Sequence, residues 1–525
     1  MRSVVLLFAS VVSLAMSQEW VDMYGLGQSQ NYSGFDITMD QAGWIYAGGV
    51  APISQFYDGP AIVRYGAPGT RSWDKVFRIH DSLGAIQDLK VAVSNAGVVA
   101  VAGYGFVSGD VSYFIAACNL QGESLWAHMY RGISSSLGSF DVAADGRGGV
   151  YLCRPEIPET TGGDIRTTKY RPDGQVEWTQ LYDGPRHSDD FGRAVAVDTA
   201  GNAYVAGQTY NALGKQKPFI LKYGTDGTLL RVVMFGTQGN NDGTFHDIAL
   251  ATDGSVYAAG EYAYLNQSPI ARYSASLDSL WNITVSGWMT RAAVDRQGNL
   301  FATGRQGPDY STWKFSSTGS QLWNRIYDGP AHGTDIPTGI AVDDSGNAYV
   351  TGQSPSTSVA EEATVKYSSA GQERWVSRCH YWTGMYANGL TASHGGDCYV
   401  TGFDKDTVGP YRWSIWITKK YRPTGPGGQE EAATSRPSGG GGIRVSPTVV
   451  ARRCRFTLPA RARATGLRIL DASGRAVWGV PTQAGETTVI WDATDEAGLP
   501  VPNGVYFVTL EGAGSRSATK FIIQR

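Results

Sequence analysis

Histidine and aspartate residues recur together in short segments along the chain, and these residue types are suited to binding a ligand. The segments are RHSDDFG (186–192), FHD (245–247) and HGTD (332–335). Imidazoles and carboxylates that converge on one point can hold a metal ion or a polar ligand. The same residue types also cap loop turns through side-chain hydrogen bonds, which requires no ligand. Both interpretations stay open for a candidate binding rim, which consists of His187, Asp190, His246, Asp247, His332 and Asp335.

No catalytic residue can be named from the sequence. The motifs of serine hydrolases, zinc proteases, P-loop proteins and dinucleotide-binding proteins do not occur in a suitable context. The repeated Asp-x-x-Gly-Asn segments lack the alternating oxygen ligands and the final bidentate glutamate of a calcium loop. We therefore expect Asp198, Asp295 and Asp344 to stabilise hairpin turns, and we expect neither a cofactor nor a bound metal.

A repeat with two halves organises most of the chain and would position the candidate residues. The first half is clearest at 196–207 (AVDTAGNAYVAG) and 341–352 (AVDDSGNAYVTG), and the second at 167–184 (TTKYRPDGQVEWTQLYDG). Short runs of Val, Ile, Tyr and Ala on either side of a glycine-containing turn are typical of a β-hairpin. Each repeat of about 50 residues therefore predicts two hairpins, which together form one four-stranded antiparallel sheet, or blade.

The number of repeats predicts an all-β fold, a closed β-propeller of about eight blades. A blade cannot bury both of its faces alone, so neighbouring blades must stack on it. The aromatic residue of the first half and the later tryptophan would fill the layers between blades. These aromatic residues of the first half are Tyr46, Tyr151, Tyr204, Tyr257, Phe301, Tyr349 and Tyr399.

The start of the mature chain is expected to complete the last blade. The other repeats end in Trp-x-x-x-aromatic or a degenerate copy of it, but the eighth, at 416–425, stops before its tryptophan. Residues 19–25 contain the missing pattern, with Trp20 and Tyr24. We expect this N-terminal strand to close the propeller, which would span 18–422, and to leave no open sheet edge.

At these residues the chain resembles the SBBP-type bacterial β-propeller repeat, which has the same VDxxGNxYVTG and xVxKYxxxGxxxW segments. The resemblance covers roughly residues 19–422. It implies a propeller at the cell surface or outside the cell. That family is defined by its repeat, so the resemblance implies no activity.

The spacing of four residues between Gly174 and Trp178 is also similar to the tryptophan-docking repeat of eight-bladed quinoproteins. A quinoprotein-type or other propeller enzyme of the cell envelope is therefore the alternative function. The Ala-x-Asp that precedes the repeat in that family is mostly missing here. The sequence also has no adjacent cysteine pair and no identifiable ligands for calcium and quinone.

Residues 1–17 have the three parts of a signal peptide. Arg2 supplies the positive charge, residues 3–16 are largely apolar, and Ala15-Met16-Ser17 fits the cleavage pattern. No later segment is a candidate membrane span. A net charge of −3 and a pI of about 6.2 do not favour binding to nucleic acid. We expect Sec export to the periplasm and then secretion or display on the outer surface.

The chain after the repeats divides into a linker and a small domain. Residues 423–442 are rich in Pro, Gly and Ser and predict a flexible linker. Short alternating runs in residues 443–525, with turns at Ala-Ser-Gly and Pro-Asn-Gly, predict a small Ig-like antiparallel β-sandwich.

The segments 467–477 (LRILDASGRAV), 491–510 and 520–525 are similar to the C-terminal sorting domain of type IX secretion cargo and to the Ig-like domain of flagellar hook-capping proteins. The sorting resemblance implies a partner in the secretion machinery; a plain accessory sandwich is the other interpretation. Together these features predict an exported, non-enzymatic propeller that acts as a binding or structural platform. Its ligand would be an unidentified extracellular protein or glycan.

Overall fold

The computed structural model describes two parts of the chain with gaps between their segments. The first part comprises residues 18–24, 32–54, 57–66, 69–80, 83–131, 139–156, 162–236, 242–355, 361–379, 385–406 and 413–421. The second comprises residues 444–446, 449–450, 454–457, 466–471, 475–481, 488–495, 498–502, 504–511 and 518–523. The predicted signal peptide (1–17) and the predicted linker (423–442) lie outside the described residues. In the described segments, no helix has the length and apolar character needed to cross a membrane.

The first part forms eight four-stranded antiparallel sheets, which confirms the predicted fold class. We number them blade 1 to blade 8 in chain order. Blade 1 consists of β2 (Ser33–Met39), β3 (Ile45–Pro52), β4 (Asp58–Tyr65) and β5 (Arg71–Val76), and blade 2 of β6 (Leu83–Val93), β7 (Val98–Val107), β8 (Asp110–Asn119) and β9 (Ser124–Arg131). Blade 3 consists of β10 (Asp141–Ala144), β11 (Val150–Glu156), β12 (Asp164–Tyr170) and β13 (Val176–Tyr182), and blade 4 of β14 (Phe191–Val197), β15 (Ala203–Tyr210), β16 (Gln216–Tyr223) and β17 (Leu229–Met234).

Blades 5 to 8 repeat this arrangement, and blade 8 takes its fourth strand from the beginning of the chain. Blade 5 consists of β18 (Gly243–Leu250), β19 (Val256–Tyr262), β20 (Gln267–Tyr273) and β21 (Ser279–Ser286), and blade 6 of β22 (Trp288–Val294), β23 (Leu300–Gln306), β24 (Asp309–Phe315) and β25 (Gln321–Tyr327). Blade 7 consists of β26 (Ile336–Val342), β27 (Ala348–Gln353), β28 (Glu362–Tyr367) and β29 (Glu373–Cys379), and blade 8 of β30 (Met385–Ala392), β31 (Cys398–Asp406), β32 (Trp413–Tyr421) and β1 (Gln18–Tyr24).

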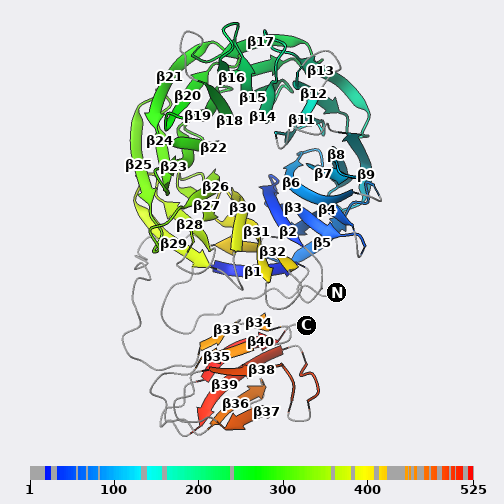
Figure 1. The fold of residues 1–525 in the computed structure, drawn as a ribbon, viewed down its shortest axis with the longest axis vertical. Helices are drawn as coiled ribbons and strands as arrows, with labels where there is room; N and C mark the ends of the chain where they lie inside the picture. The colour runs from blue at the N-terminus through cyan, green and yellow to red at the C-terminus, as the bar shows by residue number, and fades with distance from the viewer. Residues whose placement is uncertain are drawn as a thin grey trace. The chain divides into compact units, whose positions relative to one another are not determined.

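The eight blades surround a common centre (Figure 1). The first strand of each blade lies toward the centre, and the fourth strand lies at the outside of the ring. Each blade contacts the next one along the chain, and blade 8 contacts blade 1 through β30, β31 and β2. The aromatic residues of the first half, which were predicted to fill the layers between blades, are all buried, whereas the tryptophans Trp73, Trp126 and Trp281 are partly buried. This arrangement gives each blade the neighbours that its two apolar faces require.

The first strand of the described chain completes blade 8. Strand β1 pairs antiparallel with β32, with Tyr24 opposite Trp416 and Gln18 opposite Tyr421. The carboxylate of Asp22 in β1 accepts hydrogen bonds from the Arg71 guanidinium of blade 1 at 2.7–3.0 Å. The Tyr24 hydroxyl donates to Asp74 of the same blade at 2.8 Å. One short strand thus joins the end of the repeat array to its beginning.

Tryptophan side chains connect five of the blades to the next by a recurring contact. The indole Nε1 donates to a backbone carbonyl in the outer turn of the following blade, at 2.8–3.1 Å. At the turn of blade 7, Gly371 has a φ of 78°, and a Cβ there would come within 2.8 Å of Trp323. The turn must therefore keep glycine so that the indole can lie flat against it. The donor and acceptor pairs are Trp73 and Leu120, Trp126 and Pro172, Trp178 and Thr225, Trp281 and Ser317, and Trp323 and Ser369.

Aspartates at the first turn of several blades close that turn, as the sequence predicts for two of the three residues it names. Asp198 Oδ1 accepts the amides of Ala200 and Asn202, and Asp295 makes the equivalent bonds. The prediction is wrong for Asp344, because Asp343 holds that position in blade 7. Asp344 instead forms an ion pair with Arg296 at 3.0 Å.

The second part of the chain is a separate compact unit with two sheets. One sheet has the order β33-β35-β38 and the other β34-β40-β39-β36-β37. All pairs are antiparallel except β34 with β40, which the purely antiparallel prediction did not include. A buried cluster that includes Phe456, Ile469 and Trp491 forms its core. Its strands are β33 (Arg444–Ser446), β34 (Val449–Val450), β35 (Cys454–Thr457), β36 (Gly466–Asp471), β37 (Ala476–Pro481), β38 (Thr488–Trp491), β39 (Gly504–Glu511) and β40 (Ala518–Ile523).

Candidate functional site

The six residues of the predicted rim occupy two different kinds of position. His187 and Asp190 lie in the connection from β13 to β14, and His332 and Asp335 lie in the equivalent connection from β25 to β26. His246 and Asp247 lie inside β18, the innermost strand of blade 5. The six residues therefore do not form one set of equivalent positions, and this part of the prediction is wrong.

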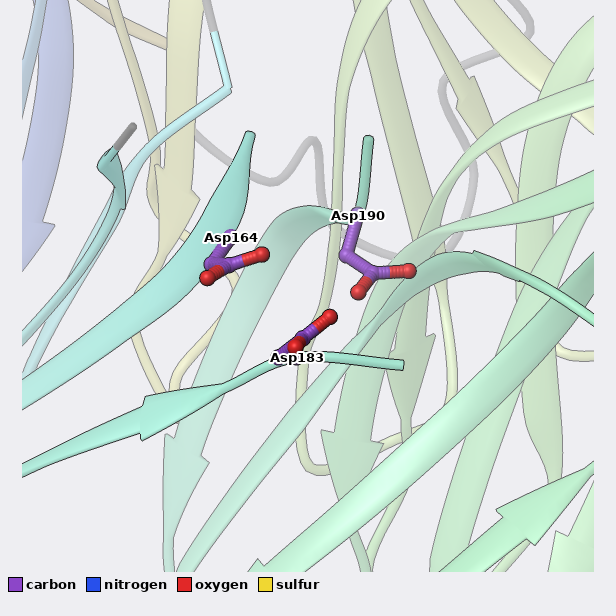
Figure 2. Close-up of side chains that lie close together, drawn as sticks. All are labelled: Asp164, Asp183 and Asp190. Atoms are coloured by element: carbon purple, nitrogen blue, oxygen red, sulfur yellow. The ribbon is translucent and has the colours of Figure 1, made fainter. Parts of the chain in front are cut away.

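The connection between blades 3 and 4 brings together three aspartates. Asp164 is the first residue of β12, Asp183 follows β13, and Asp190 precedes β14. One carboxylate oxygen from each lies within 4.8 Å of the others. Figure 2 shows the three side chains directed toward a common space. We call this set, Asp164, Asp183 and Asp190, the first aspartate cluster.

Asp190 is the most deeply buried member of the connection itself, with 1% of its surface exposed. Its Oδ2 accepts the Gly184 amide at 2.5 Å, whereas its Oδ1 has no hydrogen-bond donor among the described residues. A Cβ at position 184 would lie 2.7 Å from that Oδ1, so glycine is required for this approach. Burial raises the pKa of Asp190 to about 6; the nearby Thr209 side chain and the Gly184 amide oppose this rise, and the charges of Asp164 and Asp183 add to it.

His187 stands at the outer side of the cluster. Its Nδ1 lies 2.5 Å from Asp183 Oδ2, and this hydrogen bond raises the pKa of the imidazole. The residue is largely exposed and has a φ of 54°, a left-handed conformation that is uncommon for a residue with a side chain. The histidine thus fixes one oxygen of Asp183 and leaves Oδ1, which is buried and without a donor, facing the protein interior.

The connection between blades 6 and 7 repeats this arrangement in a second aspartate cluster, Asp309, Asp328 and Asp335. Asp335 is 1% exposed; its Oδ2 accepts the Gly329 amide at 2.8 Å, and its Oδ1 has no donor in the described segments. His332 has a φ of 51° and bonds to Asp328 at 2.6 Å. The two clusters therefore share the same residues, the same backbone conformation and the same unsatisfied oxygen.

Asp247 belongs to a different set, which joins the innermost strands of neighbouring blades. Its Oδ2 accepts the amide of Ala292 in blade 6 at 2.8 Å. Asp36 and Asp141 make the same contact to Val91 and Val195 at 3.0 and 2.8 Å. Burial raises the pKa of each of these three carboxyl groups. These aspartates connect blade 1 to 2, 3 to 4 and 5 to 6 through the backbone.

His246 lies at the bulge in β18, between Phe245 and Asp247, and has a different partner from Asp247. Its Nε2 lies 3.3 Å from Glu261 Oε1 in β19, and the histidine lowers the pKa of that glutamate. The bulge between Phe245 and Asp247 makes Asp247 equivalent to Ala194 of blade 4. It is not equivalent to Asp190, which lies four residues before Ala194.

Replacement of Asp141 by asparagine should reduce the dependence of stability on pH. Burial raises the pKa of Asp141 to about 7, with Lys90 opposing and Asp247 adding to the effect. Because the folded pKa lies above the unfolded value of about 3.9, the stabilising effect of the protonated form is complete below pH 4 and is lost as the pH rises to 7. The side chain is partly exposed, so we expect a loss on the order of 2 kcal/mol.

Urea unfolding of wild type and Asp141→Asn at several pH values between 4 and 8 measures this effect. The asparagine can still accept a hydrogen bond from the Val195 amide. As the pH rises, the free energy of unfolding of the variant should therefore increase relative to that of the wild type. Parallel curves for the two proteins would contradict the assignment of a raised pKa to Asp141.

Comparison with known protein families agrees with the two-part architecture. A β-propeller repeat model matches residues 177–214 and 329–357, and the FlgD Ig-like domain model matches residues 449–515. The fold is a β-propeller followed by a separate Ig-like unit, and parts of each are similar to these two families. The first propeller match includes Asp183 and Asp190 of the first cluster, and the second includes Asp335 of the second cluster. No curated protein matches the chain.

Several solved structures are similar to the chain at low identity. PorZ, described as an essential bacterial surface component of the type IX secretion system of Porphyromonas gingivalis, is 11% identical with a TM-score of 0.32, covering 94% of this chain and 81% of PorZ. Sqt1 of Chaetomium thermophilum is 10% identical with a TM-score of 0.46, covering 76% of this chain and 98% of Sqt1. The WD40 domain of Toxoplasma gondii coronin is 10% identical with a TM-score of 0.41, covering 76% and 91% of the two chains.

Four residues of the two clusters were not among the predicted rim residues: Asp164, Asp183, Asp309 and Asp328. A signal for two of them is present in the sequence, because Tyr-Asp-Gly-Pro-x-His-x-x-Asp occurs at 182–190 and again at 327–335. The repetition ties Asp183 to Asp190 and Asp328 to Asp335. Asp164 and Asp309 have no such local pattern, since they begin a strand that reaches the same edge of the blade from a different loop.

Proposed function

We propose that this protein is an exported β-propeller that serves as a rigid binding or structural platform at the outer cell surface or outside the cell. The Ig-like domain would act as its sorting domain and would be recognised by secretion machinery. The observation that carries the proposal is the division of the chain into a repeat ring and a separate Ig-like unit with its own core. A compact unit joined through a Pro- and Gly-rich segment can be recognised without disturbing the ring.

The propeller suits a recognition role because its loops are held by a ring of mutually supporting sheets. Binding residues are commonly carried on loops that a rigid scaffold positions. The connections between blades supply such loops, and the blades are tied together by the tryptophan contacts. The ligand that we propose is an extracellular protein or glycan.

Deletion of residues 443–525 should stop delivery to the surface while leaving Sec export intact. In the native host, the full chain should be found on the cell surface or in the medium, and the truncated chain should accumulate in the periplasm. Cell fractionation and protease accessibility of intact cells measure the two outcomes. A truncated protein that reaches the surface as efficiently as the full chain would show that the Ig-like domain does not sort.

A control separates loss of sorting from loss of folding. Trp491→Ala removes a fully buried side chain from the core of the Ig-like unit, which costs about 3–5 kcal/mol and should unfold this small unit. This variant should reproduce the truncation if the folded domain is the recognised form. Purified full chain that shows the absorption band of a bound quinone would contradict the platform role and favour the enzyme alternative.

A further inference from the structure

The two aspartate clusters have the same construction in blades that are separated along the chain. Each combines the Tyr-Asp-Gly-Pro-x-His-x-x-Asp segment of a connection with an aspartate at the start of the third strand of the preceding blade. In each, the last aspartate has 1% of its surface exposed, contributes one carboxylate oxygen to the cluster, and has an oxygen, Oδ1, without a donor among the described residues. Because two blades build the same arrangement, the unsatisfied oxygens are a property of the site itself.

Three carboxylates at this spacing repel one another unless a cation lies between them. Among the described residues, no lysine or arginine forms an ion pair with Asp183 or Asp190. A buried carboxylate oxygen without a hydrogen-bond donor is uncommon in proteins, and a bound ion or water molecule can satisfy it.

We propose that each aspartate cluster is a binding site for Ca²⁺ that braces two neighbouring blades. Calcium binds oxygen ligands at 2.3–2.6 Å, so two of its ligand oxygens can lie up to about 5 Å apart. The oxygens of each cluster lie within 4.8 Å of one another, which meets this condition. The ligands are all carboxylates, which hard cations prefer, with no sulfur ligand in either cluster.

Mg²⁺ suits a site of three protein carboxylates less well than Ca²⁺. Its ligands lie at 2.0–2.1 Å in a strict octahedron, and it usually keeps several of its waters and binds through only one or two carboxylates. Calcium accepts six to eight oxygens in flexible geometry, and water can supply those that three aspartates do not. His187 and His332 bond to an aspartate of each cluster through Nδ1 and would orient that ligand from outside.

The site would hold blades 3 and 4 together at the first cluster, and blades 6 and 7 at the second. Asp164 and Asp183 belong to blade 3 or follow it directly, whereas Asp190 leads into blade 4. An ion bound to all three would fix the end of one blade against the beginning of the next. Calcium should therefore raise the thermal stability of the ring, because it binds the folded state alone.

The first cluster should bind calcium more tightly than the second. A Cβ built on Gly329 would lie 3.0 Å from Asp335 Oδ1 and 3.1 Å from an Arg378 nitrogen, so a guanidinium already stands near the second cluster. Blade 4 has Met234 at the position of Arg378. Asp328 is also more exposed than Asp183. A competing positive charge and greater contact with water both weaken cation binding.

Calorimetric titration of the mature full chain with calcium chloride, after treatment with a chelator, tests the proposal. We expect two bound ions, one in Asp190→Asn, one in Asp335→Asn and none in the double variant, with matching losses of the calcium-dependent rise in melting temperature. Asparagine keeps an acceptor for the Gly184 and Gly329 amides, and circular dichroism checks that each variant folds. Asp183→Asn gives a second route to the first site if Asp190→Asn does not fold.

Asp189→Asn is the matched control, because it removes the same charge one residue away. Asp189 accepts the Gly163 amide at 2.7 Å and lies outside the cluster, so this variant should bind calcium as the wild type does. Wild type that binds no calcium, or a double variant with the same calcium isotherm as the wild type, would overturn the proposal. A single ion that is lost only in Asp190→Asn would support the first site and overturn the second.

Discussion

A mature chain that lacks residues 18–24 is expected to lose most or all of its stability. Removal of β1 exposes the edge of β32, and it also removes Asp22 and Tyr24 from their partners in blade 1. Burial of Val21 and Tyr24 contributes roughly 1.5–3 kcal/mol each. The charged hydrogen bonds contribute about 1.5–3 kcal/mol each. The sum approaches the 5–15 kcal/mol that holds a typical domain together.

The same strand can be moved to provide a control that keeps all of its residues. Gln18 pairs with Tyr421 in an antiparallel ladder, so a two-residue Asn-Gly turn after Tyr421 could lead directly into residues 18–24. This rearranged chain should recover the unfolding midpoint of the wild type, whereas the deleted chain should aggregate or unfold at low urea. Equal stability of the deleted chain and the wild type would show that β1 is dispensable.

A second large loss of stability is expected when the buried ion pair between blades 7 and 8 is broken. Lys419 in β32 and Glu362 in β28 form this pair, and both side chains are fully buried. Thr364 and Tyr421 donate hydrogen bonds to the same carboxylate. Lys419→Met would leave Glu362 charged in an apolar layer, so the free energy of unfolding should fall by about 3–5 kcal/mol.

Two further variants distinguish a buried charge from lost packing. In Lys419→Met/Glu362→Leu neither charge remains, and the stability should return most of the way to that of the wild type. Arg231→Met removes an exposed ion pair with Asp278 at the outer strand of blade 4 and should cost no more than about 1 kcal/mol. Urea unfolding of all four proteins measures these differences. A double variant as unstable as Lys419→Met would contradict the explanation.

The fold could be predicted because its signals repeat and lie in local patterns. The Gly-x-x-x-Trp spacing of a second hairpin places the indole on the turn of the next blade, as Trp178 and Trp323 show. The last strand of blade 8 was predicted for the same reason: Trp20 and Tyr24 carry the pattern that the eighth repeat lacks. Redundancy of this kind leaves few alternative pairings for a strand.

The candidate site could be predicted only in part, because its members come from different loops and depend on strand register. His187, Asp190, His332 and Asp335 belong to the repeated connections and were found. His246 and Asp247 were placed with them wrongly, since they lie inside β18, where Asp247 aligns with Ala194 and not with Asp190. The neighbouring aspartates 343 and 344 could not be told apart, because only the hydrogen bonds of the turn show which one closes it.

The partnership of β1 with β32 sets an order of events for the protein's assembly. Strand β1 precedes all the other strands of the propeller and finds its partner only when nearly all of the repeat array has followed it. Until then the earliest segment has no hydrogen-bonding neighbour and blade 1 has one bare face. A partly synthesised or partly exported chain therefore exposes aggregation-prone surface that proteases can cleave. It becomes resistant to proteolysis in a single late step, when β1 pairs with β32.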